Sequence, residues 1–263
     1  MNEHLVIPRR YCGPPGSGNG GYVAGSLAHH LVGAAPAARA VTVSLRQPTP
    51  LDASMQVAEH GERVQLSFGG AVIAEATVVT AEIDPVEPVS YAEAQTASAA
   101  YPGFSFHPFP TCFACGTDRP DGLRIFPGPV GPAPVEPGDS PDAGTRVAAP
   151  WTPDESIAAD YHEYADTPRR ACLAGTWSAL DCAGGWAGDF GDRMVVLAQM
   201  TAVVDELPVI GEPHVVMGQV LGREGRKTMA ATTLHDADGR IVGRARQVWV
   251  AVEPDRFSSP VAR

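Results

Sequence analysis

The chain has 263 residues, 44% of them hydrophobic, and 19 basic against 30 acidic residues give it a net charge of −11. This length suits one large domain or two of roughly 130 residues. The acidic excess argues against nucleic acid or an anionic membrane as the main partner. The apolar runs are far shorter than the ~20 residues that span a bilayer, and the N-terminus lacks the pattern of a signal peptide. We therefore expect a cytoplasmic protein.

The first half reads as one helix followed by four strands. Residues 20–32 contain no proline and gather their apolar side chains near one face, which predicts a helix. Alternating or β-branched runs then predict strands at 41–45, 55–60, 64–68 and 71–81, with turn signals at 60–62 and 69–70.

Residues 101–150 separate this half from the next. They contain 11 prolines and 7 glycines, a composition that argues against a continuous helix or a regular sheet.

The second half repeats the order of elements. A helix is predicted at 171–186, with Pro168 just before it as an early-turn residue. Strands are predicted at 195–204, 214–223, 227–235 and 240–252, and the Asp-Ala-Asp-Gly turn at 236–239 joins the last two as a hairpin.

One helix followed by an antiparallel meander, twice, indicates an α+β unit whose sheet wraps a central helix. Both helices are too apolar to lie on a surface, because residues 178–187 carry one charge in ten positions. A single β-rich domain with two surface helices is the weaker alternative.

Several segments carry a resemblance to a known family. In the second half they are CFACGTDRPDGLRIF (112–126), VAAPWTPDES (147–156), LAGTWSALDCAGGWA (173–187) and GREGRKTMAATTLHDADGRIVGRARQVWV (222–250). The first half matches more faintly, through SGNGGYVAGSLAHHL (17–31) and VTVSLRQPTPLD (41–52). Together they resemble the hot-dog thioesterases of the phenylacetyl-CoA and 4-hydroxybenzoyl-CoA type.

The resemblance implies a double hot-dog, with two antiparallel sheets that each wrap a central helix and pair within one chain. The expected boundaries are 1–95 for the N-terminal unit, 96–110 for a linker, 111–255 for the C-terminal unit and 256–263 for a tail. Association of two such chains into a homodimer is left open.

In that family the central helix begins at a His-Gly-Gly-like triplet, and an acidic residue follows seven positions beyond the second glycine. The glycine end of one helix faces the acidic residue of its antiparallel partner. Here the first triplet is Asn19-Gly20-Gly21 and its acidic position holds Ala28, whereas Cys172-Leu173-Ala174 is followed by Asp181. Each half keeps what the other lost, which predicts one complete site per chain.

The resemblance assigns roles to these residues. Asp181 is the base or nucleophile, and Gly20 or Gly21 at the positive end of a helix holds the thioester carbonyl and its oxyanion. Asn19 orients the carbonyl or a water. The alternatives are a structural carboxylate and glycines that only allow close helix packing.

Two further groups are candidates. Gln247 resembles a glutamine that fused double hot-dog acyl-CoA thioesterases place near their aspartate, with a solvent-facing strand residue as the alternative. Arg226 and Lys227, with Arg223 nearby, are expected to contact the phosphates of CoA in a region of local positive charge. A solvated strand face is the bland alternative.

Five cysteines include the pair Cys112 and Cys115. A structural zinc needs four ligands, and no second such pair or His-x₃₋₅-His follows. We expect these thiols to help fold their loop, with no metal and no cofactor beyond the CoA of the substrate.

The predicted function is hydrolysis of an acyl-CoA thioester. A non-catalytic acyl-ligand binding protein is the first alternative. An enoyl-CoA hydratase is less favoured, because residues 205–214 do not reproduce the closely spaced aspartate and histidine of those enzymes.

Overall fold

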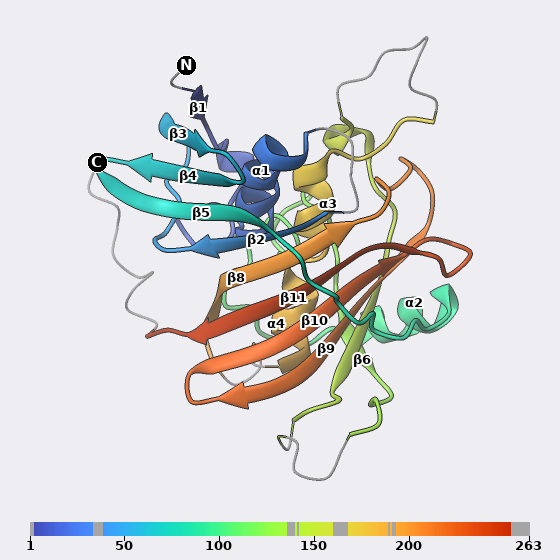
Figure 1. Cartoon of the computed structure of the whole chain (residues 1–263). Coiled ribbons are helices and arrows are strands. Elements are labelled where there is room, and N and C mark those ends of the chain that lie inside the picture. The colour runs from blue at the N-terminus through green and yellow to red at the C-terminus, as the bar shows by residue number, and fades with distance from the viewer. Residues whose placement is uncertain are drawn as a thin grey trace.

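The computed structural model describes residues 3–33, 39–135, 140, 142–159, 168–188, 190 and 193–253. In these residues the strands form one antiparallel sheet of eleven, in the order β1-β3-β4-β5-β2-β8-β11-β10-β9-β7-β6 (Figure 1). The first half supplies β1 (Glu3–Leu5), α1 (Gly20–Val32), β2 (Ala40–Leu45), β3 (Met55–His60), β4 (Arg63–Phe68) and β5 (Ala71–Val79).

The second half supplies the other side of the sheet and a second helical segment. Its elements are β6 (Gly128–Val130), β7 (Arg146–Trp151), α3 (Leu173–Ala179), α4 (Cys182–Gly188), β8 (Val195–Val204), β9 (His214–Glu224), β10 (Lys227–His235) and β11 (Ile241–Ala251). Helix α2 (Tyr91–Ala99) lies between the halves, and short 3₁₀ turns occur at Arg9–Tyr11, Pro102–Phe104 and Glu155–Ile157. None of the helices in the described ranges has the length and apolarity needed to cross a bilayer.

The two halves join along a single strand pair. β2 runs antiparallel to β8, with Val41 opposite Ala202 and Ser44 opposite Gln199. Gln199 Nε2 donates to Ser44 Oγ across the seam at 3.0 Å. Two helix-on-sheet units therefore share one continuous sheet, which confirms the expected double hot-dog.

Helices α1 and α3 lie side by side on one face of this sheet (Figure 1). A Cβ at Gly21 would lie 2.9 Å from the Cα of Ser178, and one at Gly25 would lie 2.7 Å from the Cα of Ala174. Residue numbers thus increase along α1 in the direction in which they decrease along α3, so the helices are antiparallel. Glycine at both positions lets the two backbones approach this closely.

The predicted helix at 20–32 and the eight predicted strands are confirmed, with ends that differ by at most two residues. The continuous helix predicted at 171–186 is wrong, because α3 ends at Ala179, α4 begins at Cys182, and Leu180 and Asp181 form a turn between them. The carbonyl of Leu180 accepts from Thr232 Oγ1 at 2.7 Å and from Gln247 Nε2 at 2.5 Å. Side chains from β10 and β11 thereby take an acceptor that a continuous helix would use itself.

The proline-rich region contains two strands that its composition did not indicate. β7 pairs with β9 over its whole length, and β6 pairs only with Arg146–Ala148. Pro150 therefore lies beyond the end of β6, where its missing N–H leaves no hydrogen bond to β6 unmade.

The connection between the halves crosses the part of the sheet that the second half supplies, on the face opposite α4. Val86 N donates to Thr233 Oγ1 at 2.8 Å, and the Val86 carbonyl lies 3.0 Å from His235 Nε2. Helix α2 follows and buries Ala94 and Ala97 beside Ala148 of β7 and Met217 of β9. Because strand side chains alternate in direction, α2 covers the opposite face from α4. The predicted tail at 256–263 lies outside the described residues.

Candidate active site

Asp181 sits where the second helical segment breaks, and its carboxylate faces the start of α1. Its Oδ2 atom accepts from Asn19 Nδ2 at 2.8 Å and from the Gly21 backbone N–H at 3.0 Å. Both donors come from the first half of the chain. The structure therefore brings Asn19, Gly20, Gly21 and Asp181 together across the two halves, and the catalytic roles expected of them stay a prediction.

Asn19 is the N-cap of α1 and is 2% exposed. Its Oδ1 atom accepts from the Tyr22 N–H at 2.9 Å and from Ser178 Oγ at 2.7 Å. With its oxygen engaged in this way, the amide must direct its NH₂ toward Asp181. Ser178 was not among the predicted residues; its signal was the spacing of three residues before Asp181 on one helix face.

The Asp181 carboxyl group is buried, and this environment sets its ionisation. Burial raises its pKa to about 7, the Gly21 N–H and the Asn19 amide act against that rise, and the nearby Cys112 adds to it. The second oxygen, Oδ1, is buried and accepts no hydrogen bond from the described residues. A carboxylate with one tethered oxygen and one free oxygen is suited to accepting a proton.

A pocket of about 550 Å³ opens beside this carboxylate. Gly20, Asn19 and Asp181 line it, and its apolar lining includes Leu45, Phe109, Phe190, Leu197 and Trp249. Gly20 is the first residue of α1, so its N–H has no partner within the helix and is free for a ligand. Gly21 has a different position, because it lies between the helices and its N–H already binds Asp181.

Gln247 is 2% exposed, which contradicts the solvent-facing alternative. Its Nε2 donates to the carbonyls of Leu180 and Asp181, at 2.5 and 3.0 Å, and its Oε1 accepts from Trp249 Nε1 at 2.9 Å. A Cβ at Gly184 would lie 1.8 Å from Gln247 Oε1, so only glycine leaves room for the amide. Gln247 therefore holds the backbone of the helix break rather than the carboxylate.

Three buried thiols line the same pocket: Cys112, Cys115 and Cys182. Hydrogen bonds from Cys115 and Cys182 lower the pKa of the Cys112 thiol, and backbone N–H groups assist. Sequence reasoning paired Cys112 with Cys115 but missed Cys182, which lies 67 positions beyond Cys115 and next to Asp181.

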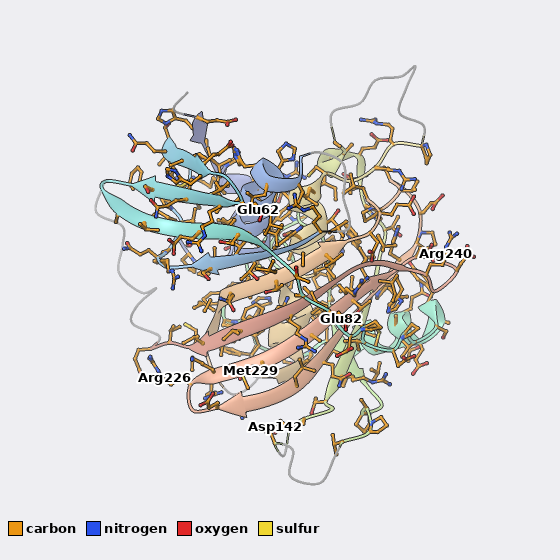
Figure 2. All side chains as sticks on the ribbon, viewed as in Figure 1. Glu62, Glu82, Asp142, Arg226, Met229 and Arg240 are labelled. Carbon is orange, nitrogen blue, oxygen red and sulfur yellow. The ribbon has the colours of Figure 1, made fainter. Side chains whose placement is uncertain are left out.

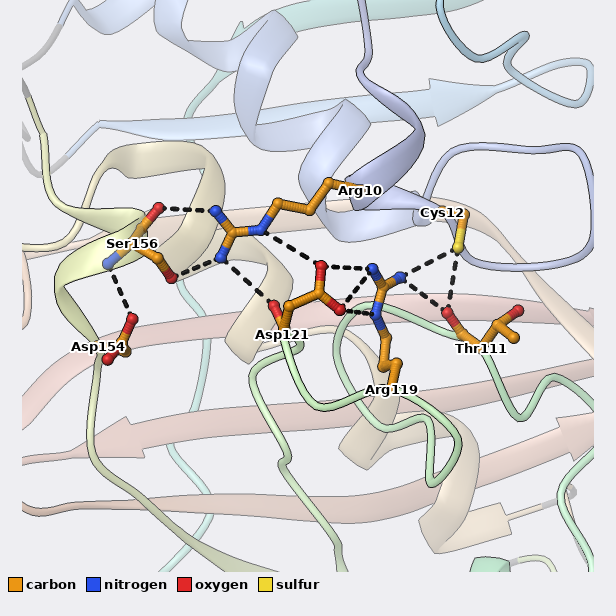
Figure 3. A network of polar contacts seen from close by, with 7 residues as sticks. All are labelled: Arg10, Cys12, Thr111, Arg119, Asp121, Asp154 and Ser156. Carbon is orange, nitrogen blue, oxygen red and sulfur yellow. Dashed lines mark hydrogen bonds and ion pairs between the residues drawn. The ribbon is translucent and has the colours of Figure 1, made fainter.

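The loop that carries Cys112 is fixed at both ends. The Phe113 N–H donates to the Cys12 carbonyl at 2.7 Å, and the Gly116 N–H donates to the Cys112 carbonyl at 2.9 Å. Figure 3 shows Arg119 between Asp121 and the Thr111 carbonyl, to which it donates at 2.9 Å. Arg10 joins this network from the first half of the chain, through Asp121 and Ser156.

The basic residues between 223 and 246 do not form one positive surface. Figure 2 places Arg226 at one end of β10 and Arg240 at the other. Arg240, Arg244, Arg246 and Arg223 are each paired with a carboxylate, from Asp236, Asp205, Asp84 and Asp142 respectively. Among the described residues, Arg226 and Lys227 form no ion pair, and both are exposed. They lie beside the pocket, because Lys227 is opposite the lining residue Val250.

Among the described residues, the other end of the helix pair lacks a carboxylate at the position equivalent to Asp181. Cys172 is the N-cap of α3, and its sulfur accepts from the N–H of Gly175, three residues later, at 3.3 Å. Asn19 caps α1 in the same way, by accepting from the Tyr22 N–H. Ala28 occupies the position that corresponds to Asp181 and is fully buried. The pocket reaches neither Ala28 nor Cys172.

No family model matches the sequence, and no curated protein matches it. The solved structures that resemble nearly the whole chain include the following three. The tesB protein of Mycobacterium avium subspecies paratuberculosis is 13% identical, with a TM-score of 0.53 over 95% of this chain and 88% of its own. A conserved protein of unknown function with a hot-dog fold, from Alicyclobacillus acidocaldarius, is 13% identical, with a TM-score of 0.57 over 95% and 93%.

The third is a proposed thioesterase from Novosphingobium aromaticivorans, 15% identical, with a TM-score of 0.56 over 95% of both chains. At such low identity these similarities establish the architecture and leave the activity to the site. The chain has the hot-dog fold, with two units joined in one polypeptide.

Proposed function

We propose that this protein hydrolyses an acyl-CoA thioester at one composite site formed by the start of α1 and the break between α3 and α4. The observation that carries the proposal is the arrangement of Asp181. One of its oxygens is held by Asn19 and Gly21, the other has no donor among the described residues, and the carboxylate lies beside a pocket of about 550 Å³. A solved structure of the same fold is itself a proposed thioesterase.

In the proposed reaction the thioester carbonyl accepts a hydrogen bond from the Gly20 N–H. Negative charge that develops on this oxygen is stabilised by that donor and by the positive end of α1. Asp181 removes a proton from a water as the water attacks the carbonyl carbon, and the C–S bond then breaks. The proton passes to the departing sulfur, so that the products are a carboxylic acid and free CoA thiol.

Two residues act through others in this scheme. Asn19 holds the Asp181 carboxylate through its amide and fixes the start of α1 through its oxygen. Gln247 holds the carbonyls of Leu180 and Asp181, and so fixes the direction of the carboxylate. Both are positioning residues.

The pocket and its surroundings provide for the two ends of the substrate. Leu45, Phe190, Leu197 and Trp249 form an apolar wall that suits an acyl group. Arg226 and Lys227 lie where β10 begins, and the Arg226 carbonyl accepts from the Ala251 N–H at 2.8 Å, next to lining residue Val252. We assign these two cations to the phosphates of CoA and leave out Arg223, which is engaged with Asp142.

A panel of saturated acyl-CoAs, assayed for release of free thiol, tests the function. The expected result is turnover of at least one member, lost in an Asp181→Asn preparation purified in the same way. If an enoyl-CoA instead loses its ultraviolet absorbance without release of thiol, the protein hydrates the double bond and is a hydratase. Saturable binding of acyl-CoA with neither reaction would establish a binding protein.

A further inference from the structure

The three thiols beside Asp181 are arranged as ligands for a single ion. The sulfur atoms of Cys112, Cys115 and Cys182 all lie within 4.8 Å of one another, and the Cys112 and Cys182 sulfurs are 3.7 Å apart. Zinc–sulfur bonds of about 2.3 Å in a tetrahedron place neighbouring sulfurs about 3.8 Å apart. The observed separation therefore matches the edge of a zinc tetrahedron.

A disulfide fits the same pair less well. It would require the two sulfurs to approach to about 2.05 Å, well inside the observed 3.7 Å. The loop that carries Cys112 is tightly packed, because a Cβ at Gly116 would lie 2.4 Å from the Pro110 carbonyl and 2.5 Å from that of Cys112. This tight loop holds Cys112 and Cys115 in fixed relative positions.

Hydrogen-bond donors surround the sulfurs as they do in thiolate metal sites. Asn19 Nδ2 lies 3.7 Å from the Cys112 sulfur. His107 Nε2 lies 3.4 Å from the Cys115 sulfur. Because His107 Nδ1 accepts from the Phe109 N–H at 2.9 Å, the neutral ring carries its hydrogen on Nε2. This N–H lies 3.1 Å from the Cys115 carbonyl oxygen as well as 3.4 Å from the Cys115 sulfur. His107 is therefore a hydrogen-bond partner of the cluster and not its fourth ligand.

The side of the cluster that faces the pocket also holds an unpartnered acceptor. The three cysteines and Asp181 line the same cavity, and Oδ1 of Asp181 is buried with no donor among the described residues. A water bound to an ion on the three sulfurs would supply a donor within this cavity. Sites with three protein ligands and one water are the pattern of open zinc centres.

We propose that Cys112, Cys115 and Cys182 bind one thiolate-seeking divalent cation, with zinc the best match, and leave its fourth position open to the pocket. This proposal departs from the expectation of no metal, which counted only the cysteines that are adjacent in sequence. It does not depend on thioester hydrolysis, because the site is defined by the ligands alone.

The test uses the full chain and measures metal. Protein produced in zinc-containing medium is expected to carry about one equivalent of zinc by elemental analysis. After removal of zinc, titration with Co²⁺ is expected to yield a sulfur-to-cobalt charge-transfer band and the visible bands of tetrahedral cobalt, saturating at one equivalent.

The five cysteines provide matched controls. Cys182→Ser should lose the charge-transfer intensity of one sulfur and weaken binding by at least tenfold, whereas Cys172→Ser, outside the cluster, should leave the spectrum and the zinc content unchanged. Thiol labelling of the parent protein covers the case in which Cys182→Ser fails to fold. Cys112, Cys115 and Cys182 should become reactive together when a chelator is added, while the reactivity of Cys172 is unaffected.

Three outcomes would overturn the proposal. The first is parent protein that neither retains zinc nor yields a cobalt–sulfur band. The second is a cobalt–sulfur band of undiminished intensity and affinity in Cys182→Ser, and the third is a Cys112–Cys182 disulfide in protein isolated without reductant. Each can be recorded whether or not the protein hydrolyses a thioester.

Discussion

The two ends of the helix pair have the same backbone design and different chemistry. At one end Asn19 caps α1 and its amide holds Asp181; at the other Cys172 caps α3 with its sulfur. The acidic position lies nine residues beyond each cap, and it holds Asp181 in one helix and Ala28 in the other. Helix packing is nearly symmetric, because Gly21 meets Ser178 as Gly25 meets Ala174.

The candidate site therefore depends on groups that each half supplies to the other, because donors of the first half hold a carboxylate of the second. A pocket, a buried carboxylate and its two donors meet at the Asn19 end. At the Cys172 end there is no carboxylate at the equivalent position, and the cap is a poor donor. Changing one of these features at a time should have the following effects.

The largest effect is expected from removing the carboxylate. Asp181→Asn should lower turnover by about 10²–10⁴-fold, the contribution of a general base, with little change in melting temperature because asparagine can keep both accepted bonds. Asp205→Asn, in an exposed ion pair with Arg244, is the matched control and should keep full turnover. A structural Asp181 would instead show a lowered melting temperature and activity preserved in the folded fraction.

The second largest effect on turnover is expected from replacing the cap residue of α1, and no effect is expected from replacing the cap residue of α3. Asn19→Ala is expected to lower kcat about 10²-fold, since a displaced catalytic group can cost that much, and to lose about 1 kcal/mol of stability with the cap. Cys172→Ser keeps a cap and does not line the pocket beside Asp181, so its kcat should equal that of the parent. Kinetics at a temperature where both variants are folded separate the two effects; equal kcat losses would contradict the asymmetry.

Restoring the missing acid should not restore the second site. Ala28→Asp buries a carboxyl group without the donors that Asp181 has, at an expected cost of about 1–3 kcal/mol of unfolding free energy. Burial would raise its pKa above the unfolded value of about 4. The part of the cost that comes from ionisation is therefore present above that value and disappears as pH falls toward it, which melting curves across pH would reveal.

Ligand stoichiometry tests the same asymmetry in the parent protein. Titration with a nonhydrolysable acyl-CoA analogue should saturate at one equivalent per chain. Ala28→Asp should leave that number unchanged; two equivalent sites in either protein would contradict the model.

The smallest effect is expected at the cations beside the pocket. Replacing Arg226 and Lys227 with alanine should raise KM for acyl-CoA about fivefold, as exposed charge contacts contribute about 1 kcal/mol, and leave kcat unchanged. An acyl-cysteamine, which lacks the CoA phosphates, should show no change. Arg240→Ala, at the opposite end of β10 (Figure 2), is the control; an equal rise in its KM would refute the assignment.

Much of the site could be predicted because its chemistry is written in short segments. Alternation placed the strands, and the motif that the resemblance supplied, applied to Asn19 and Ala28 and to Cys172 and Asp181, predicted the complementary halves. Ser178 and Cys182 escaped prediction although they flank Asp181, since neither belongs to the motif that the resemblance supplied. Gln247 was identified, but its hydrogen bonds to the Leu180 and Asp181 carbonyls could not be foreseen from a strand pattern.

What the sequence by itself determined is therefore the repeated helix and meander, because periodicity is a local property. The division of one acidic site between two helices is what the resemblance predicts for this chain. The tertiary structure decided where the second helix breaks, since Thr232 and Gln247 reach its backbone from β10 and β11. It also decided which cations remain unpaired and that Cys182 joins Cys112 and Cys115. These features depend on contacts between segments far apart in the chain, whose distances only the folded backbone fixes.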